Sequence, residues 1–305
     1  MQFTKALVTG GSGFIGSHLV DALIDRGVAV TVVDKAEPKH RNGKATYVIH
    51  DIRLDGLNEI FTEAKPEVVF HLAAHIDDRA SVHDPVMNAD HNVMGSLRVL
   101  EAARHVGVKK LMFSSTCAVY GIPAKLPITE KLLPAPRTPY GISKLVIEHY
   151  LNFYQNLHQL PSVALRLANV YGPRQDGSKE SGAISVFTSK LLAGEAPFLN
   201  DDGQTIRDYI HVSDVVSAFV LAAESDKTGV YNVGTKVGTT TRDLYALIAS
   251  ELGSVLEPLA RPDVIDAVKA VTLKARKAKQ ELGWKPKWRL AKGLKQTLKW
   301  YKAQV

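Results

Sequence analysis

The sequence predicts an α/β fold, a doubly wound parallel sheet joined to a smaller α/β lobe. Three observations favour it. Apolar segments of strand length alternate with segments of helical periodicity through the first half of the chain. A glycine-rich turn, TGGSGFIG at 9–16, lies between the first strand and the first helix, and Asp34 ends the next apolar segment, VAVTVVD. Strands separated by helices imply parallel β-α-β crossovers.

The elements of the first half follow from their apolar patterns. We expect strands at 5–9, 28–34, 45–50, 67–74, 109–115 and 162–167, and helices over about 13–26, 85–106 and 139–158. After about Gly172 the pattern becomes irregular, and helices resume at about 212–224 and 242–252. The sequence therefore predicts a first domain over 1–170 and a mainly substrate-binding lobe over 171–305, with some segments returning to the first domain.

Length and composition restrict the function classes. The 305 residues are 45% hydrophobic and 23% charged, as in ordinary globular proteins. No apolar stretch approaches the roughly 20 residues that span a bilayer. The N-terminus has no cleavable signal pattern, so we expect a cytoplasmic protein without a membrane partner. The single cysteine, Cys117, excludes an intrachain disulfide.

The chain is basic, with a formal net charge of +7. Its basic residues are densest near the end, in LKARKAKQELGWKPKWRLAKGLKQTLKWY, where they alternate with apolar residues at helical spacing. We interpret this segment as the solvated face of terminal helices and expect no nucleic-acid partner. A basic surface also favours an anionic small substrate.

The glycine turn has the context of a dinucleotide-binding site, which a plain flexible turn would not need. Gly10 permits the tight turn, Gly13 lets the backbone approach a pyrophosphate, and Gly16 lets helix and strand pack closely. The helix N-terminus offers free N–H groups and a positive partial charge. Asp34 can accept hydrogen bonds from both ribose hydroxyls and would repel a 2′-phosphate. It therefore favours NAD over NADP, although the adjacent Lys35 weakens that preference.

Further motifs follow the G-x-x-G-x-x-G turn in a fixed order. They are DIR (51–53), HLAA (71–74), FSSTCAVYG (113–121), YGISK (140–144), RLANVYGPRQ (166–175) and RDYIHVSDV (207–215). Together they resemble the extended short-chain dehydrogenase/reductase family, and within it the nucleotide-sugar epimerases of the UDP-glucose 4-epimerase type. The resemblance covers nearly the whole chain and implies a Rossmann-like sheet with NAD as cofactor.

The resemblance also implies which residues contact NAD. They come from the glycine turn, the ends of later strands and two helices: Gly10, Gly13, Phe14, Ile15, Gly16, Asp34, Asp51, Ile52, Leu72, Ala73, Ala74, Asn92, Tyr140 and Lys144. Asp51 is expected to hold the adenine amino group; the alternative is that it only caps the following turn. Lys144 is expected to contact the nicotinamide ribose.

Tyr140 and Lys144 are four residues apart, so on a helix they share one face. An ammonium near a phenol favours the phenolate and lowers the pKa of the phenol, which suits Tyr140 to act as a base. A surface Tyr and Lys is the plainer alternative. By resemblance, Thr116 is the catalytic hydroxyl residue and touches the sugar. The implied cycle oxidises C4 to a transient ketone, turns the sugar and returns the hydride to the opposite face.

The two residues after Thr116 bear on the reaction type. Sugar 4,6-dehydratases of this family carry Asp-Glu there, whereas this chain has Cys117 and Ala118. Epimerisation needs no second acid, so their absence favours an epimerase. No His is near Cys117 in sequence, and we interpret it as a packed strand-end residue rather than a nucleophile.

On the substrate side, the resemblance implies that Asn169 binds the nucleotide diphosphate and that Arg207 and Arg261 grip phosphate oxygens. The family's usual Arg-x-Gly-Asp lacks its Gly in ARPDV, which weakens the assignment of Arg261. The alternatives are a turn residue for Asn169 and a surface ion pair with Asp208 for Arg207.

We therefore expect an NAD-dependent nucleotide-sugar 4-epimerase, an isomerase acting on a nucleoside-diphosphate sugar such as a UDP-hexose. The open alternatives are a UDP-glucuronate or UDP-N-acetylhexosamine 4-epimerase, another nucleotide-sugar dehydratase or reductase, and a non-catalytic NAD sensor. The His residues show no metal-ligand spacing, so no metal is expected. Family members pair the helices that correspond to 85–106 and 139–158 into a four-helix bundle, which implies a homodimer.

Overall fold

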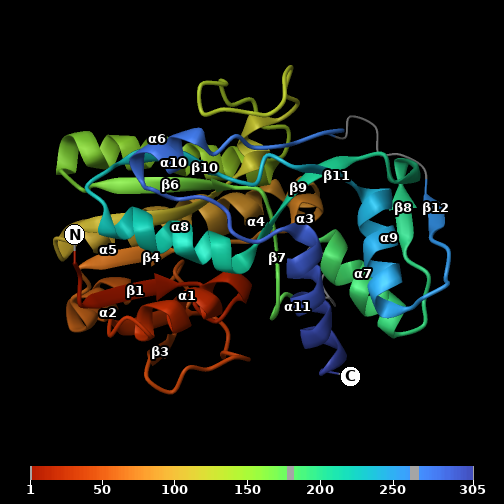
Figure 1. Cartoon of the computed structure of the whole chain (residues 1–305). Helices are drawn as coiled ribbons and strands as arrows, with labels where there is room; N and C mark the ends of the chain where they lie inside the picture. The colour runs from red at the N-terminus through yellow and green to blue at the C-terminus, as the bar shows by residue number, and fades with distance from the viewer. Residues whose placement is uncertain (1, 177–181, 262–267, 305) are drawn as a thin grey trace.

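The computed structural model describes residues 2–176, 182–261 and 268–304. Its centre is a parallel sheet in the order β10-β6-β5-β4-β1-β2-β3 (Figure 1). The strands are β1 (Lys5–Thr9), β2 (Ala29–Asp34), β3 (Thr46–Ile49), β4 (Val68–His71), β5 (Lys110–Thr116), β6 (Ser162–Leu167) and β10 (Gly229–Val233). The strand order reverses between β1 and β4, the switch point at which such sheets bind nucleotides. The predicted doubly wound sheet is confirmed.

The two faces of the sheet are covered by separate sets of helices. Alternate residues of each strand point to opposite faces, so Val8 and Leu7 of β1 belong to different hydrophobic clusters. Val8 packs with α1 (Phe14–Ile24) and α8 (Val212–Glu224). Leu7 packs with α2 (Leu57–Ala64), α5 (Gly95–His105) and α6 (Pro139–His158). Both clusters are buried, as the near-continuous apolar strands require.

The structure corrects the expected single helix over 85–106. This segment is divided into α4 (Pro85–Ala89), a π-helical turn η1 (Asp90–Met94) and α5. A further short helix, α3 (Asp78–His83), precedes it. The turn places the buried Asn92 against the chain after β4. There its amide accepts from the His75 N–H at 2.7 Å and donates to the His75 carbonyl at 2.9 Å. Single π-helical turns within α-helices occur often at functional sites.

The smaller lobe has its own core. Two short sheets, β11-β9-β7 and β12-β8, are formed by β7 (Asn169–Tyr171), β8 (Phe198–Asn200), β9 (Ile206–His211), β11 (Gly238–Thr240) and β12 (Leu259–Arg261). The helices α7 (Ala183–Leu192), α9 (Thr241–Leu252) and α11 (Leu290–Lys302) enclose a third hydrophobic cluster. The short elements are η2 (Cys117–Tyr120), η3 (Asp201–Gly203) and α10 (Arg276–Glu281). The domain division at residue 170 stays a prediction. Beyond that residue, β10 is a strand of the large sheet and α8 packs against one face of it.

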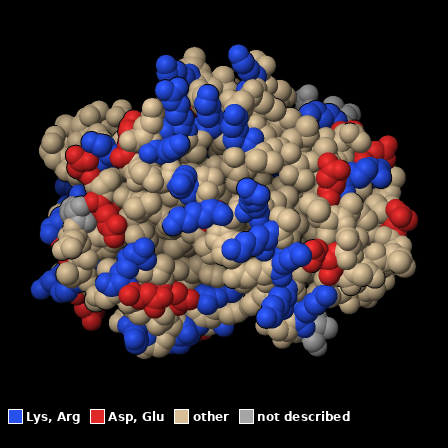
Figure 2. All heavy atoms as spheres, in the orientation of Figure 1, with Lys and Arg blue, Asp and Glu red and all other residues tan. Residues whose placement is uncertain are grey.

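The basic C-terminal segment follows the expected pattern of exposure. Lys285, Lys295 and Lys299 are exposed, whereas Trp284 and Leu294 are buried. Figure 2 shows Lys and Arg gathered over the middle of one face, with Asp and Glu mainly toward its sides. Within the described ranges, none of the helices has the length and apolar character needed to cross a bilayer.

Candidate active site

The glycine turn between β1 and α1 is a tightly packed cradle. Gly10 has φ +73°, and a Cβ there would lie 2.6 Å from the Ala73 nitrogen. A Cβ on Gly16 would lie 2.1 Å from the Gly10 carbonyl oxygen. At Gly13, by contrast, it would meet only that oxygen, at 3.3 Å. The turn therefore closes against β4 and α1 and stays open along Gly13, as a backbone that approaches a pyrophosphate requires.

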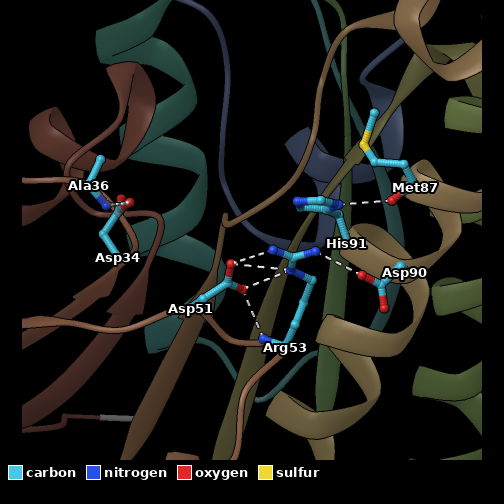
Figure 3. A network of polar contacts seen from close by, with 7 residues as sticks. All are labelled: Asp34, Ala36, Asp51, Arg53, Met87, Asp90 and His91. Atoms are coloured by element: carbon cyan, nitrogen blue, oxygen red, sulfur yellow. Dashed lines mark hydrogen bonds and ion pairs between the residues drawn. The ribbon is translucent and has the colours of Figure 1, made fainter. Parts of the chain in front are cut away.

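Polar groups around this cradle suit a dinucleotide. Among the described residues, no side chain caps the start of α1, and the buried Ser12 hydroxyl finds no hydrogen-bond partner. Asp34, at the end of β2, accepts from the Ser12 N–H at 3.0 Å. It also accepts from the Ala36 N–H at 3.1 Å (Figure 3). These contacts fix the carboxylate beside the turn. The next two residues of the predicted set, Phe14 and Ile15, open α1. The cradle, the free helix start and the carboxylate fit NAD.

A second network joins the loop after β3 to the π-helical turn (Figure 3). The Arg53 guanidinium donates to both carboxylate oxygens of Asp51 and, at 2.8 Å, to Asp90. These bonds hold the pKa of Asp51 down at about 2. Asp51 also accepts from the Arg53 N–H at 3.0 Å, so it does cap the following turn, and a role toward adenine remains a proposal. Ile52, beside it, is buried.

The end of β4 brings three more predicted residues to the glycine turn. Leu72, Ala73 and Ala74 directly follow the strand, and the Leu72 N–H donates to the Thr9 carbonyl at 3.0 Å. His71 is buried between Thr9 and Ser96, with ring nitrogens 2.7 and 2.8 Å from their hydroxyls. Burial lowers the pKa of this imidazole to about 3. His71 is therefore a neutral residue at the end of β4.

The catalytic candidates meet where β5 ends and α6 begins. Thr138 caps α6 by accepting from the Gly141 N–H, and Pro139 suits the first helical position. This places Tyr140 beside Thr116, whose hydroxyl acts on the pKa of the phenol. The Lys144 ammonium lies 5.9 Å from the Tyr140 ring centroid and donates to the Ser114 carbonyl at 2.8 Å. The structure thus brings the hydroxyl, phenol and ammonium together at one edge of the sheet.

The structure corrects one expectation about this group. Burial raises the pKa of the Tyr140 phenol, while the hydrogen bond to Thr116 opposes that rise. Burial also lowers the pKa of Lys144, to about 7. The predicted lowering of the phenol pKa by Lys144 is therefore wrong for these residues alone, because burial removes the hydration of both charged forms. The extent of burial is a tertiary property that the four-residue spacing does not reveal.

Glu148, a residue that the sequence reasoning missed, links α6 to the strands β5 and β6. It lies one turn beyond Lys144 on α6 and accepts from the Ser115 hydroxyl at 2.6 Å. It also pairs with Arg166 of β6, whose Nε donates to it at 2.9 Å. Both members of the pair are buried. The four-residue spacing of 140, 144 and 148 could have indicated that Glu148 shares a helix face with Tyr140 and Lys144. Its partners on β5 and β6 could not be found from the sequence.

Cys117 follows Thr116 and is partly buried. Burial raises the pKa of its thiol to about 11, so the thiolate is disfavoured. This environment supports a packing role over a nucleophilic one.

The three predicted substrate residues lie on three different short strands. Asn169 of β7 lines a concave pocket with Gln175, Ala183 and Tyr209. Arg207 of β9 is half-buried and donates to the Ile206 carbonyl at 2.9 Å. The structure brings Arg207 near Cys117, since the two influence each other's pKa.

The alternative ion pair between Arg207 and Asp208 is wrong. Asp208 is buried and accepts from the backbone N–H groups of Thr235, Lys236 and Leu273. Neighbouring residues on a strand point to opposite faces, which separates the two side chains.

Arg261 is more exposed than Arg207. It is exposed at the end of β12, and its guanidinium lies 4.3 Å from the centroid of the Phe198 ring. The contacts of the described residues do not join it to Arg207 or Asn169.

Comparisons with known proteins agree with this geometry. The sequence model of the NAD dependent epimerase/dehydratase family matches residues 6–234. A UDP-glucose 4-epimerase of Mycolicibacterium smegmatis is 41% identical, with 98% of each chain covered. The crystal structure of a Thermotoga maritima UDP-glucose 4-epimerase with UDP-glucose superimposes with a TM-score of 0.96 at 42% identity, covering 98% of this chain and 99% of that one. A Thermus thermophilus UDP-glucose 4-epimerase in complex with NAD gives 0.93 at 37% identity, covering 99% and 100%.

The chain therefore belongs to the NAD-dependent epimerase/dehydratase family. It is an enzyme of the epimerase type, and its cofactor is NAD.

Proposed function

We propose that this protein is a UDP-hexose 4-epimerase that works through a transient 4-keto sugar. The observation that carries the proposal is the meeting of Thr116, Tyr140 and Lys144 at the sheet edge where the glycine turn opens. Cys117 and Ala118, beside them, offer no carboxylate for expelling water from a ketone. The similarity to enzymes named UDP-glucose 4-epimerase over nearly their whole length supports the same reaction.

Each residue has a defined task in this proposal. Bound NAD supplies the hydride acceptor and donor. Tyr140 takes the proton from the sugar O4 and later returns it, and Thr116 bridges that hydroxyl and the phenol. Lys144, anchored on the Ser114 carbonyl, holds the nicotinamide ribose. Asp34 receives the adenosine ribose hydroxyls. Around the cofactor, the glycine turn, the 51–52 and 72–74 segments and Asn92 complete the binding site.

On the substrate side, Asn169, Arg207 and Arg261 hold the diphosphate while the hexose turns. Arg207 is the best supported of the three, because a half-buried guanidinium near the proposed catalytic residues needs an anion to complete its hydrogen bonds. The exposed Arg261 supports this binding from the rim.

The proposal also covers the oligomeric state and the location of the protein. Apolar side chains are exposed along η1 and α6, among them Met94, Phe153 and Leu157. We infer that these helices pair across a two-fold axis in a cytoplasmic homodimer, since burying such a surface symmetrically is the commonest solution. Light scattering at micromolar concentration tests this; a monomer contradicts it.

The reaction is tested by incubating the purified protein with NAD and a panel of UDP-sugars. The panel contains UDP-glucose, UDP-galactose, their N-acetylated forms and UDP-glucuronate. Proton NMR should show inversion at C4, while absorbance at 340 nm should show no accumulation of NADH in proportion to substrate. A stable keto sugar would replace the proposal with a dehydratase. No turnover of any substrate, with NAD still bound, would favour a sensor.

A further inference from the structure

Asp78 lies beside the start of the catalytic helix. It begins α3, and its carboxylate accepts from the hydroxyl of Thr138, the cap of α6, at 2.6 Å. One turn along α3, the Ser81 hydroxyl accepts from the Tyr140 N–H at 3.2 Å. Two hydrogen bonds therefore fix α3 to the first turn of α6. They hold the Asp78 carboxylate close to the residue that carries the proposed base.

The charge of the same carboxylate acts on residues at both ends of the proposed sugar site. Asp78 is exposed. Its negative charge helps to raise the pKa of the Tyr140 phenol. Burial lowers the pKa of the Arg207 guanidinium, and the charge of Asp78 opposes this change. The Cys117 thiol interacts electrostatically with the same two groups. The hydrogen bonds to Thr138 and Tyr140 place α3 beside this group of side chains. A sugar that reaches from a phosphate at Arg207 to the phenol of Tyr140 would therefore pass near the Asp78 carboxylate.

We propose that Asp78 is a specificity-determining residue that selects neutral hexoses and rejects sugars with a carboxylate, such as hexuronates. The inference rests on the proposed 4-epimerase function. A carboxylate can accept a hydrogen bond from a sugar hydroxyl, which favours a hexose. Against a hexuronate it sets two like charges side by side, which is costly.

The neighbouring Asp77 provides a matched control. It carries the same charge on the same segment, but its carboxylate accepts from the Ala80 N–H at 2.8 Å and caps α3. Asp77 is not among the groups that influence Tyr140 or Arg207. A substitution there removes one negative charge without changing the charge beside the phenol.

The test compares wild type, Asp78→Asn and Asp77→Asn. Asparagine keeps the Oδ1 acceptor for Thr138, so the start of α6 should be retained, and the thermal midpoint and NAD affinity check this. The measurement is kcat/KM for C4 inversion of UDP-glucose and UDP-glucuronate. Wild type should prefer UDP-glucose, and Asp78→Asn should shift the ratio toward UDP-glucuronate by at least about tenfold. Asp77→Asn should leave the ratio within about twofold.

Three results would overturn the inference in different ways. If UDP-glucose is epimerised and Asp78→Asn leaves the ratio unchanged, Asp78 does not set specificity and the proposed function stands. Equal shifts in both variants would mean that overall charge, and not the position of Asp78, controls the choice. If wild type inverts C4 in none of the UDP-sugars, the proposed function itself fails, and this inference fails with it.

Discussion

The cofactor end and the substrate end of the site are built in different ways. At the cofactor end, Gly10, Gly16 and Asp34 belong to one continuous β-α-β unit, and backbone geometry shapes the cradle. At the proposed substrate end, Asn169, Arg207 and Arg261 come from strands in two small sheets, and their side chains would have to converge across the lobe. A site made by contiguous backbone is tolerant of few changes but recognisable from sequence. A site made by dispersed side chains is adjustable and depends on tertiary placement.

The largest effect is expected where the two ends meet. Tyr140→Phe should lower kcat about 10²- to 10⁴-fold, because the ring fills the same space but cannot move a proton. NAD affinity, measured by calorimetry, should change little. Tyr150→Phe, on an exposed side chain of the same helix, is the control. Residual activity above a tenth of wild type would remove Tyr140 from the role of base.

The next largest effect tests the backbone character of the cofactor end. Gly16→Ala places a methyl group 2.1 Å from the Gly10 oxygen, so turn and helix must separate. We expect a loss of about 1–3 kcal/mol in the free energy of unfolding, together with weaker NAD binding. Gly43→Ala is the control, since a Cβ there meets nothing within 4 Å. Equal midpoints of urea denaturation for the two variants would mean that the glycine turn can shift to accommodate the methyl group, which would contradict this prediction.

A third prediction separates two residues within the substrate end. Arg207→Ala should raise KM for the UDP-sugar about 10- to 100-fold, because it removes charged hydrogen bonds in a half-buried place. Arg261→Ala should raise it less than about fivefold, since exposed charges contribute little. Steady-state kinetics on both variants measures the difference. Equal effects would mean that Arg261 leaves the Phe198 ring and joins the phosphate site on binding.

The smallest effect concerns cofactor choice. Asp34→Asn keeps acceptors for the Ser12 and Ala36 N–H groups but removes the charge that repels a 2′-phosphate. The ratio of NADP to NAD dissociation constants should fall about tenfold by calorimetry. Asp25→Asn, at the far end of α1, is the matched control. Wild type with equal affinity for both cofactors would refute the role of Asp34.

Sequence patterns predict the parts of the fold that depend on local order. The apolar segments locate the first six strands of the large sheet, and the helix over 139–158 has the predicted bounds. The seventh strand, β10, was missed because its partner β6 lies more than sixty residues earlier. The π-helical turn at 90–94 was missed because helical periodicity continues through it.

The same limit applies to the site. Thr116, Tyr140 and Lys144 follow from a motif, and the structure brings them together. Glu148 and Arg166 face each other only after α6 packs on β6. The raised pKa of the Tyr140 phenol depends on burial by several elements, which spacing cannot express. The roles of the substrate residues stay predictions, because Arg207 and Arg261 are placed by different sheets.

The late pairing of β10 with β6 has a consequence for synthesis of the chain. Residues 162–167 emerge from the ribosome well before residues 229–233, and until then β6 is an open edge of buried apolar residues. Such an edge recruits other strands and promotes aggregation. A fragment that ends at residue 170 would keep this edge permanently, although it contains the whole glycine turn and the catalytic motif. We therefore expect nascent chains of this protein to be most prone to aggregation over this interval.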